Sequence, residues 1–198
     1  MPLELRIKII DMKTGKVEVD RPSHSFVIAF IQTLCCYWKG GQAQGTNFQE
    51  LIVDTGGVGR TGSSISSASS GFFMNLNGAV AVYDNDGIQV GTSNVAQDPT
   101  DRALINKINT GTGGGQLEYG PSGFVLPVNV AGTISTIVSR TVRNASPGPI
   151  TINEVGIYAQ VQMGAVLFTI CIVRDVVDPV LCNVGDVKLC QYILQTVN

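Results

Sequence analysis

The sequence predicts an all-β protein, a two-sheet antiparallel β-sandwich of jelly-roll type with one buried N-terminal helix and a short second helix. Three observations predict this class. Short runs rich in apolar residues recur along the chain, turn-forming Gly and Pro separate them, and one stretch alone shows a convincing helical pattern. At 198 residues the chain can bury a substantial core, and we expect residues 1–198 to form a single β-sandwich domain.

The N-terminal elements are predicted to be a β-hairpin followed by the helix. Apolar and charged residues alternate over residues 3–9, and a turn at 11–15 leads into a return strand. The helix should start after Ser23 or Ser25, which can serve as its N-cap, and stop at glycines 40–41. Because apolar residues surround most of this helix, we expect it to be buried on most sides.

A Gly/Ser-rich segment, residues 55–71, dominates the middle of the chain and follows a predicted strand at 48–54. This composition cannot build a core, so we expect a long loop or an arm that contacts neighbouring subunits. The arm residues proposed for assembly are Gly56, Gly57, Arg60, Ser63, Ser64 and Ser66. Farther along we expect a hairpin turn at 84–87, and the short second helix over 98–108.

Two long strands, at 150–158 and 165–176, organise the C-terminal third. In the first strand the apolar residues are even-numbered before Asn153 and odd-numbered after Glu154. This shift in the alternation predicts a β-bulge or a change of face at these two residues. The second is apolar on both parities and should be covered on both sides. Glu154 then needs a partner, and hairpin geometry favours a structural ion pair with Arg174. Further strands are predicted at 116–119, 124–130, 132–143 and 187–197, with a loop at 144–149.

The composition bears on partners and on the cellular compartment. A net charge of −2 offers no basic face for nucleic acid or for a membrane surface, and the apolar runs are too short to cross a bilayer as a helix. Charged residues make up 14% of the chain, which favours a surface covered by other copies in a homo-oligomer, although a β-rich surface low in charge would give the same composition. We find no secretory signal.

The chain has five cysteines, an odd number, and their spacing does not match a metal-binding motif. We therefore interpret them as buried thiols of a protein that is made in a reducing cytoplasm. Whether Cys182 pairs with Cys190, or Cys35 with Cys36, stays open, and Cys171 is the fifth.

Several motifs superficially suggest chemistry, and each lacks a necessary part. Glycines 56–62 resemble a phosphate loop but lack its Lys and the following helix. Residues 84–87 have the carboxylate spacing of a calcium loop without its distal Glu. His24 has no nucleophile elbow, and nothing brings Glu118 beside Glu154 as an acid/base pair. We therefore expect no catalytic, cofactor or metal site, and no enzyme. Asn144 starts a glycosylation motif, which has no meaning without secretion.

The order of segments resembles that of small virion structural proteins of tailed bacterial viruses. The matching pieces cover nearly the whole chain: 23–27, 87–93, 101–104 with Ile108, 111–119, 152–158 and 172–176. The resemblance implies a non-enzymatic β-sandwich that is made in the host cytoplasm and joins the virion as a capsid decoration, minor capsid, neck or tail component. Its implied partners are further copies of itself and other virion proteins, such as the major capsid or tail proteins. The cysteines depart from the family pattern.

A second class of function stays open at this point. A jelly roll could equally serve as a receptor- or glycan-binding module of a tail fibre. Few aromatic residues fall in the predicted loops, which counts against that alternative.

Overall fold

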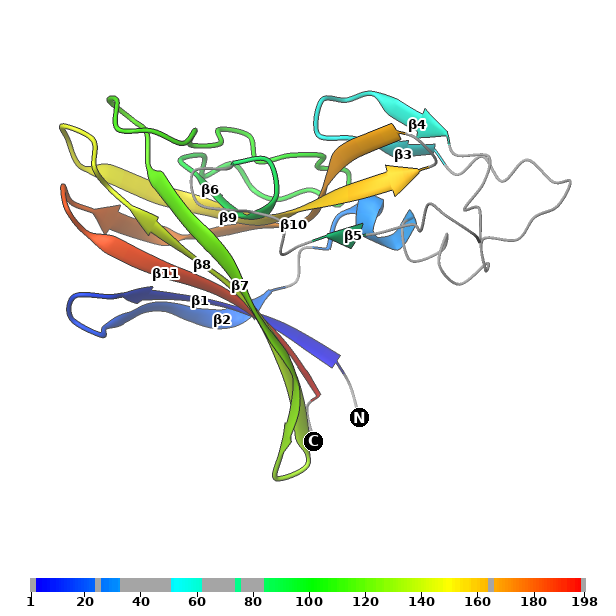
Figure 1. Cartoon of the computed structure of the whole chain (residues 1–198), viewed down its shortest axis with the longest axis horizontal. Coiled ribbons are helices and arrows are strands. Elements are labelled where there is room, and N and C mark those ends of the chain that lie inside the picture. The colour runs from blue at the N-terminus through cyan, green and yellow to red at the C-terminus, as the bar shows by residue number, and fades with distance from the viewer. Residues whose placement is uncertain are drawn as a thin grey trace, which may run out of the picture.

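The protein folds mostly as antiparallel β-structure (Figure 1). The computed structural model describes residues 3–23, 26–32, 51–61, 74–75, 84–163 and 166–196. Within these ranges the strands form two main sheets and a separate two-stranded ribbon, and helix is limited to residues 28–32. The predicted all-β class is therefore confirmed.

The larger sheet contains five strands in the order β2-β1-β11-β8-β7, and every neighbouring pair is antiparallel. Their bounds are β1 Leu3–Asp11, β2 Val17–Ser23, β7 Glu118–Val130, β8 Thr133–Arg143 and β11 Val187–Thr196. In β1, the buried Leu5, Ile7 and Ile9 alternate with half-exposed residues, so one face of the sheet points into the core. The predicted N-terminal hairpin is present as β1 and β2.

The smaller sheet has the order β10-β9-β5, and β6 also pairs with β9. Its strands are β5 Met74–Asn75, β6 Gly87–Gly91, β9 Ile150–Met163 and β10 Val166–Cys182, while β3 Leu51–Val53 and β4 Gly59–Thr61 form the separate ribbon. The central part of β10, residues 170–175, is buried throughout, which confirms the predicted cover on both sides of that strand.

Polar contacts join the two sheets across their shared core. The Ser23 hydroxyl of β2 donates to Asp175 Oδ2 of β10 at 2.7 Å, and the Tyr192 hydroxyl of β11 donates to the same oxygen at 2.9 Å. The side chain of Asp175 therefore faces the larger sheet. Because neighbouring residues of a strand point to opposite faces, Arg174 points away from the larger sheet.

The outer face of the smaller sheet is covered by the strap, defined here as residues 92–117. In Figure 1 this chain runs as green loops over β9 and β10. Along part of its length the strap pairs with β6, where the Ile108 amide donates to the Val90 carbonyl at 2.9 Å. Next to this pairing, Thr92 at the start of the strap donates its amide to the Asn106 carbonyl of the same segment at 3.0 Å. The smaller sheet is thus enclosed between the strap and the larger sheet.

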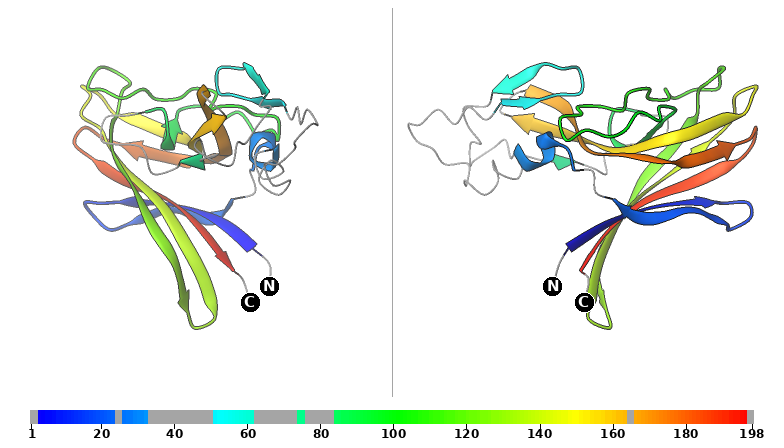
Figure 2. Two further views of the ribbon diagram at one scale, coloured as in Figure 1. Left: turned by 45° about the vertical axis from the view of Figure 1, so that its right-hand side comes forward. Right: turned by 180° about the vertical axis from the view of Figure 1, so that it is seen from behind.

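The far end of the larger sheet extends beyond this enclosure. Figures 1 and 2 show the paired β7 and β8 running away from the smaller sheet, with both chain ends beside them. We call this region the projecting end; it comprises residues 124–134 of β7 and β8 with the adjoining Leu3 of β1 and Leu194 of β11.

The helical predictions need correction. Ser23 lies in β2, where its hydroxyl binds Asp175 and cannot cap a helix. In the helical turn 28–32, Ala29 is buried but Ile28 and Ile31 are exposed, so the prediction of burial on most sides is wrong there. Residues 33–41, with Cys35, Cys36 and the predicted helix end, lie outside the described residues, as do His24 and Ser25.

The short second helix predicted over 98–108 is absent from this described part of the strap. Asp98 Oδ1 does accept the Thr100 amide at 2.8 Å, as a helix cap would. The chain then leaves the turn because the amides of Ile105 and Asn106 donate to Glu154 and not to carbonyls of a preceding helical turn. A tertiary acceptor has replaced the local one.

The predicted arm begins as ordered structure. Asp54 Oδ1 accepts the amides of Gly56 and Val58 at 3.0 and 2.9 Å, and Gly57 has a φ of 80°, so these residues form the turn between β3 and β4. The prediction of a structureless arm is therefore wrong for residues 55–61. Arg60 lies in β4, while Ser63, Ser64 and Ser66 lie outside the described residues.

The irregularity predicted at Asn153 and Glu154 exists, but on the other strand. Glu154 pairs with Val176, and Ile152 pairs with Val180. Two positions on β9 therefore correspond to four positions on β10, so the extra residues of the bulge belong to β10. β9 itself keeps its alternation and does not change face, which corrects that alternative. The apolar alternation in the sequence shifts here because a buried charged residue, Glu154, takes an inward position on the same face as Ile152.

Candidate functional site

Glu154 and Arg174, predicted to be partners, lie in contact beneath the strap. Arg174 Nε donates to Glu154 Oε2 at 2.9 Å, and both side chains are 0% exposed. In the register of β9 and β10, Arg174 lies opposite Gly156 and Glu154 opposite Val176, so the two are diagonal neighbours on one face. This position explains how side chains from two long strands meet.

The strap supplies the remaining donors to Glu154. Its Oε1 accepts the amides of Asn106 at 2.8 Å and Ser93 at 3.4 Å, and its Oε2 accepts the amide of Ile105 at 3.1 Å. With Arg174, four N–H groups surround the carboxylate. A carboxylate saturated in this way is a structural anchor and has no free lone pair for proton transfer.

The strap also satisfies Arg174. Nη1 donates to Asp101 Oδ2 at 2.7 Å and to the Ala96 carbonyl at 3.4 Å, and Nη2 donates to the Val95 carbonyl at 2.8 Å. Burial opposes the charge on this guanidinium, but the hydrogen bonds that it donates to Asp101 and Glu154 outweigh that effect and raise the pKa of Arg174. Asp101 was missed in the sequence, because the pattern of residues 98–108 predicts a helix.

Two glycines allow the backbone to approach this network closely. A Cβ on Gly91 would lie 2.4 Å from Glu154 Oε1 and 2.6 Å from the Asn106 carbonyl oxygen. A Cβ on Gly156 would lie 2.7 Å from the Val173 carbonyl oxygen and 3.0 Å from Leu104 Cδ2. Glycines inside strands were the sequence signal that another segment packs against the sheet at these positions.

Two buried tyrosines anchor the strap at further points. The Tyr158 hydroxyl accepts the Leu104 amide at 2.8 Å, and the Tyr119 hydroxyl donates to the Ile108 carbonyl at 2.8 Å. Burial raises the pKa of both phenols, so neither ionises near neutral pH. Their role here is to fix the strap.

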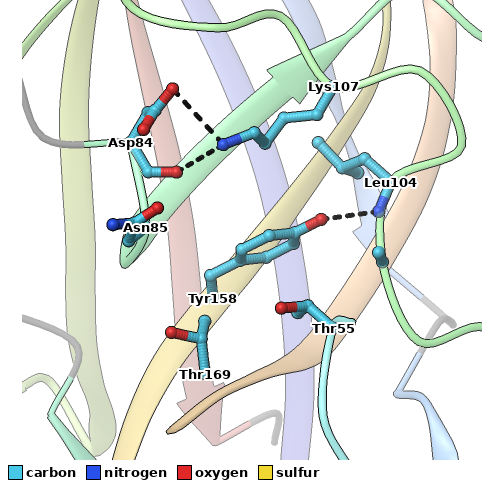
Figure 3. Close-up of a pocket in the computed structure, with 8 residues that line it drawn as sticks. Thr55, Asp84, Asn85, Leu104, Lys107, Tyr158 and Thr169 are labelled. Carbon is cyan, nitrogen blue, oxygen red and sulfur yellow. Dashed lines mark hydrogen bonds and ion pairs between the residues drawn. The ribbon is translucent and has the colours of Figure 1, made fainter. Parts of the chain in front are cut away.

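A small pocket opens beside Tyr158, between the strap, the turn before β6 and the strands β9 and β10 (Figure 3). Its volume is about 230 Å³, and its lining residues are Thr55, Asp84, Asn85, Ala103, Leu104, Lys107, Tyr158 and Thr169. Lys107 Nζ lies 3.4 Å from Asp84 Oδ2 and donates to the Asp84 carbonyl at 2.6 Å. The residues 84–87, compared above with a calcium loop, thus contribute to a pocket in which a cation side chain already neutralises Asp84.

The projecting end has an apolar and uncharged surface. Leu126 is 73% exposed and Leu3 71%, although both belong to strands. The other exposed apolar residues of this end are Phe124, Val125, Val128, Val130, Ile134 and Leu194. Residues 119–139 and 189–198 contain no ionisable side chain other than Tyr and Cys. Four of the exposed residues, Leu3, Phe124, Ile134 and Leu194, continue the face that forms the core elsewhere in the sheet.

The remaining candidate residues do not combine into a catalytic set among the described residues. Glu118 lies on β7 and pairs with Arg143 at 3.2 Å, away from Glu154. Asn144 is buried, and its side-chain amide donates to the carbonyls of Gly148 and Cys182, so it organises the loop 144–149. Glycosylation would require that amide nitrogen to be accessible.

The described cysteines, Cys171, Cys182 and Cys190, are free and buried. Burial raises the pKa of the Cys182 thiol to about 11 and of the Cys190 thiol to about 12. Both are therefore protonated at neutral pH and poor nucleophiles. The described part of the chain holds no group of three or more metal-ligating side chains, and no helix there has the length and apolarity to span a membrane.

Comparison with known proteins adds no family to this description. No family model, curated protein or solved structure matches the chain.

Proposed function

We propose that this protein is a non-enzymatic structural subunit that assembles into or decorates the particle of a tailed bacterial virus, in contact with copies of itself and with other virion proteins. The observation that carries the proposal is the projecting end. An exposed apolar surface that continues a core face is typical of a protein interface.

The neutrality of this surface bears on its partner. The charged residues of β1 near this end, Glu4 and Arg6, alternate with Leu3 and Leu5 and therefore fall on the other face of the sheet. A neutral apolar face desolvates no charge when it meets a second neutral apolar face, whereas a charged partner would lose hydration without compensation. A second copy of this chain offers such a face.

The region beneath the strap, with Glu154 and Arg174, supports a structural role in a different way. Its buried ion pairs are saturated with hydrogen bonds, and the strap leaves no acid, base or nucleophile free among the described residues of the network. We also propose that the two sheets are the layers of a sandwich of jelly-roll type. In support, the chain passes from β8 in the larger sheet to β9 in the smaller one and returns from β10 to β11.

The test is the assembly state of a variant with charges on the projecting end. We expect the wild-type protein to form oligomers in size-exclusion chromatography with light scattering, and Leu3→Asp/Ile134→Asp, which charges two exposed residues of this face, to elute as a folded monomer. Val184→Asp is the matched control, because Val184 is also an exposed apolar residue and lies in the turn at the opposite end of the larger sheet. Mass spectrometry of purified particles should find the chain as a component. A wild-type monomer that is absent from particles would contradict the proposal.

A second candidate function is a receptor- or glycan-binding module of a tail fibre. The polar pocket beside Tyr158 favours it, because assembly through the projecting end does not use that pocket. A pull-down on host cells distinguishes the two, since a purely structural subunit would not bind them.

A further inference from the structure

We infer that the pocket beside Tyr158 binds a single neutral sugar ring, either a free monosaccharide or the terminal residue of a glycan. The inference rests on the second candidate function and is independent of the proposed self-association.

The charges in the pocket cancel. Asp84 and Lys107 are its ionisable residues apart from the phenol of Tyr158, which burial keeps protonated, and they form an ion pair with 3.4 Å between Nζ and Oδ2. Asp84 Oδ2 also accepts the Thr110 amide at 3.0 Å, which fixes the carboxylate in place. A charged ligand would have to compete with this internal pair, whereas a neutral one can use its remaining donors and acceptors.

The other polar groups suit hydroxyls. Among the described residues, the side chains of Thr55, Asn85 and Thr169 make no hydrogen bond, and each can both donate and accept. The Tyr158 hydroxyl accepts the Leu104 amide and keeps its own proton for a further acceptor. A sugar hydroxyl likewise donates and accepts at once, so a ring bearing several hydroxyls can match this set.

The shape of the pocket limits the ligand to one ring. Its volume of about 230 Å³ lies below the range of about 300–1,000 Å³ that is usual for drug-sized ligands. Leu104, Ala103 and the Tyr158 ring supply an apolar wall for the C–H groups of the sugar. Figure 3 shows Lys107 and Asp84 on one side of the Tyr158 ring and Thr55 and Thr169 on the other, so polar groups flank the apolar wall.

The pocket is preformed by the buried network. Lys107 follows Asn106, whose amide is held by Glu154 at 2.8 Å, and Leu104 is held by Tyr158. The Thr55 amide donates to the Thr169 carbonyl at 3.0 Å, which joins two of the lining segments. A site fixed in this way loses little conformational entropy when it binds a ligand.

The experiment is a titration followed by NMR chemical shifts, with neutral hexoses and N-acetylglucosamine as probes, and glucuronic acid and glucosamine as charged analogues. We expect the neutral sugars to bind with millimolar Kd and to shift resonances of the pocket residues. Thr55→Val/Thr169→Val, which removes two hydroxyls at nearly constant volume, should raise Kd about tenfold or more. Ala103→Phe, which fills the pocket, should abolish the shifts.

Thr151→Val is the control. This Thr is half-buried on β9 outside the pocket, and the same substitution there should leave Kd unchanged. Methyl glycosides that bind as well as the free sugars would identify the terminal residue of a glycan as the source, whereas a requirement for the free anomeric hydroxyl would identify a monosaccharide. Binding of the charged analogues alone, or no shift with any neutral sugar, would overturn the inference. Glycan binding that all pocket variants retain would overturn this site while leaving the receptor function standing.

Discussion

The region beneath the strap and the projecting end reverse the usual distribution of polar and apolar groups. Beneath the strap, Glu154 and Arg174 are buried in full. At the projecting end, Leu126 and Leu3 are exposed to solvent. Burying an ion pair costs more free energy than it returns unless each charge is hydrogen-bonded, and exposing large apolar residues forgoes hydrophobic stabilisation.

The difference teaches that the two regions answer to different requirements. Beneath the strap each nitrogen of the Arg174 guanidinium and both carboxylate oxygens of Glu154 have partners within the chain. This polar network therefore specifies one position for a segment that has little regular structure of its own. The projecting end has no such internal partners. We propose that its complement is supplied by another molecule.

Breaking the buried pair should have the largest effect on stability. In Glu154→Gln the new amide brings N–H groups toward the donors of Ile105 or Arg174 and leaves the guanidinium without one of its two carboxylates. We expect a loss of about 3–5 kcal/mol in the free energy of unfolding, measured by urea denaturation.

The matched control is Glu118→Gln in the exposed pair with Arg143, which should cost less than about 1 kcal/mol. Equal midpoints for wild type and Glu154→Gln would show that the buried pair contributes no net stability.

Overpacking the network is the next largest change. Gly91→Ala places a Cβ 2.4 Å from Glu154 Oε1 and 2.6 Å from the Asn106 carbonyl oxygen, and because that carbonyl belongs to the backbone, the strap must shift. We expect the free energy of unfolding, measured by thermal or urea denaturation, to fall by about 1–3 kcal/mol. Gly114→Ala, where nothing lies within 4 Å of the added Cβ, should be close to neutral. If both substitutions had the same effect, the close packing of the strap would be in doubt.

A buried ion pair at the turn between β1 and β2 should make stability depend on pH. Lys188 Nζ donates to Asp11 Oδ2 at 2.6 Å, and this bond, followed by those from Thr14, lowers the pKa of Asp11 below its ordinary 3.8. The pKa of Asp11 is lower in the folded state than in the unfolded state. The stabilisation by this pair is therefore complete at pH values above the unfolded-state pKa of about 3.8, and it is lost as the pH falls through the folded-state pKa.

Asp11→Asn should therefore destabilise the protein at neutral pH and flatten the acid limb of its stability profile, measured as urea midpoints against pH. A variant with the wild-type profile would show that another carboxylate is responsible for acid unfolding.

Charging the projecting end should change stability least. Leu3→Asp/Ile134→Asp alters two exposed side chains, and we expect the free energy of unfolding of the monomer to stay within about 0.5 kcal/mol of wild type. Circular dichroism at a dilution where the wild type is also monomeric makes the comparison. A large loss of stability would mean that these residues serve the fold of the monomer and not a partner.

The parts of the fold that follow from local pattern were predicted, and the parts that depend on a distant partner were not. Alternation identified β1 because half of its residues face water, and the apolar run of β10 indicated cover on both sides. The second helix failed because Asp98 and Thr100 carry a true local cap signal, while the amides farther along bind Glu154, a residue about fifty positions away. The start of the predicted arm failed similarly, because the carboxylate of Asp54 orders glycines that appear flexible by composition.

Of the candidate sites, the ion pair could be predicted from the sequence, whereas the pocket and the exposed surface could not. Glu154 and Arg174 could be paired from the sequence because both lie in adjacent long strands joined by a short connection, so diagonal contact is nearly built into the hairpin. The pocket could not be foreseen, since Thr55, Lys107 and Thr169 come from segments with no sequence relationship to one another. The exposed surface could not be foreseen either, because Leu3 and Ile9 belong to the same apolar alternation in the sequence and differ only in what packs against them.

The sequence by itself determined the β class, the hairpins and the need of Glu154 for a partner, because these depend on the period of two, on turn residues and on the cost of burying a charge. Tertiary structure alone decided that the strap closes over β9 and β10, that Asp101 is the second carboxylate on Arg174, and that part of an apolar sheet face stays exposed. Each of those outcomes depends on which segments meet in space, and a local pattern carries no information about that.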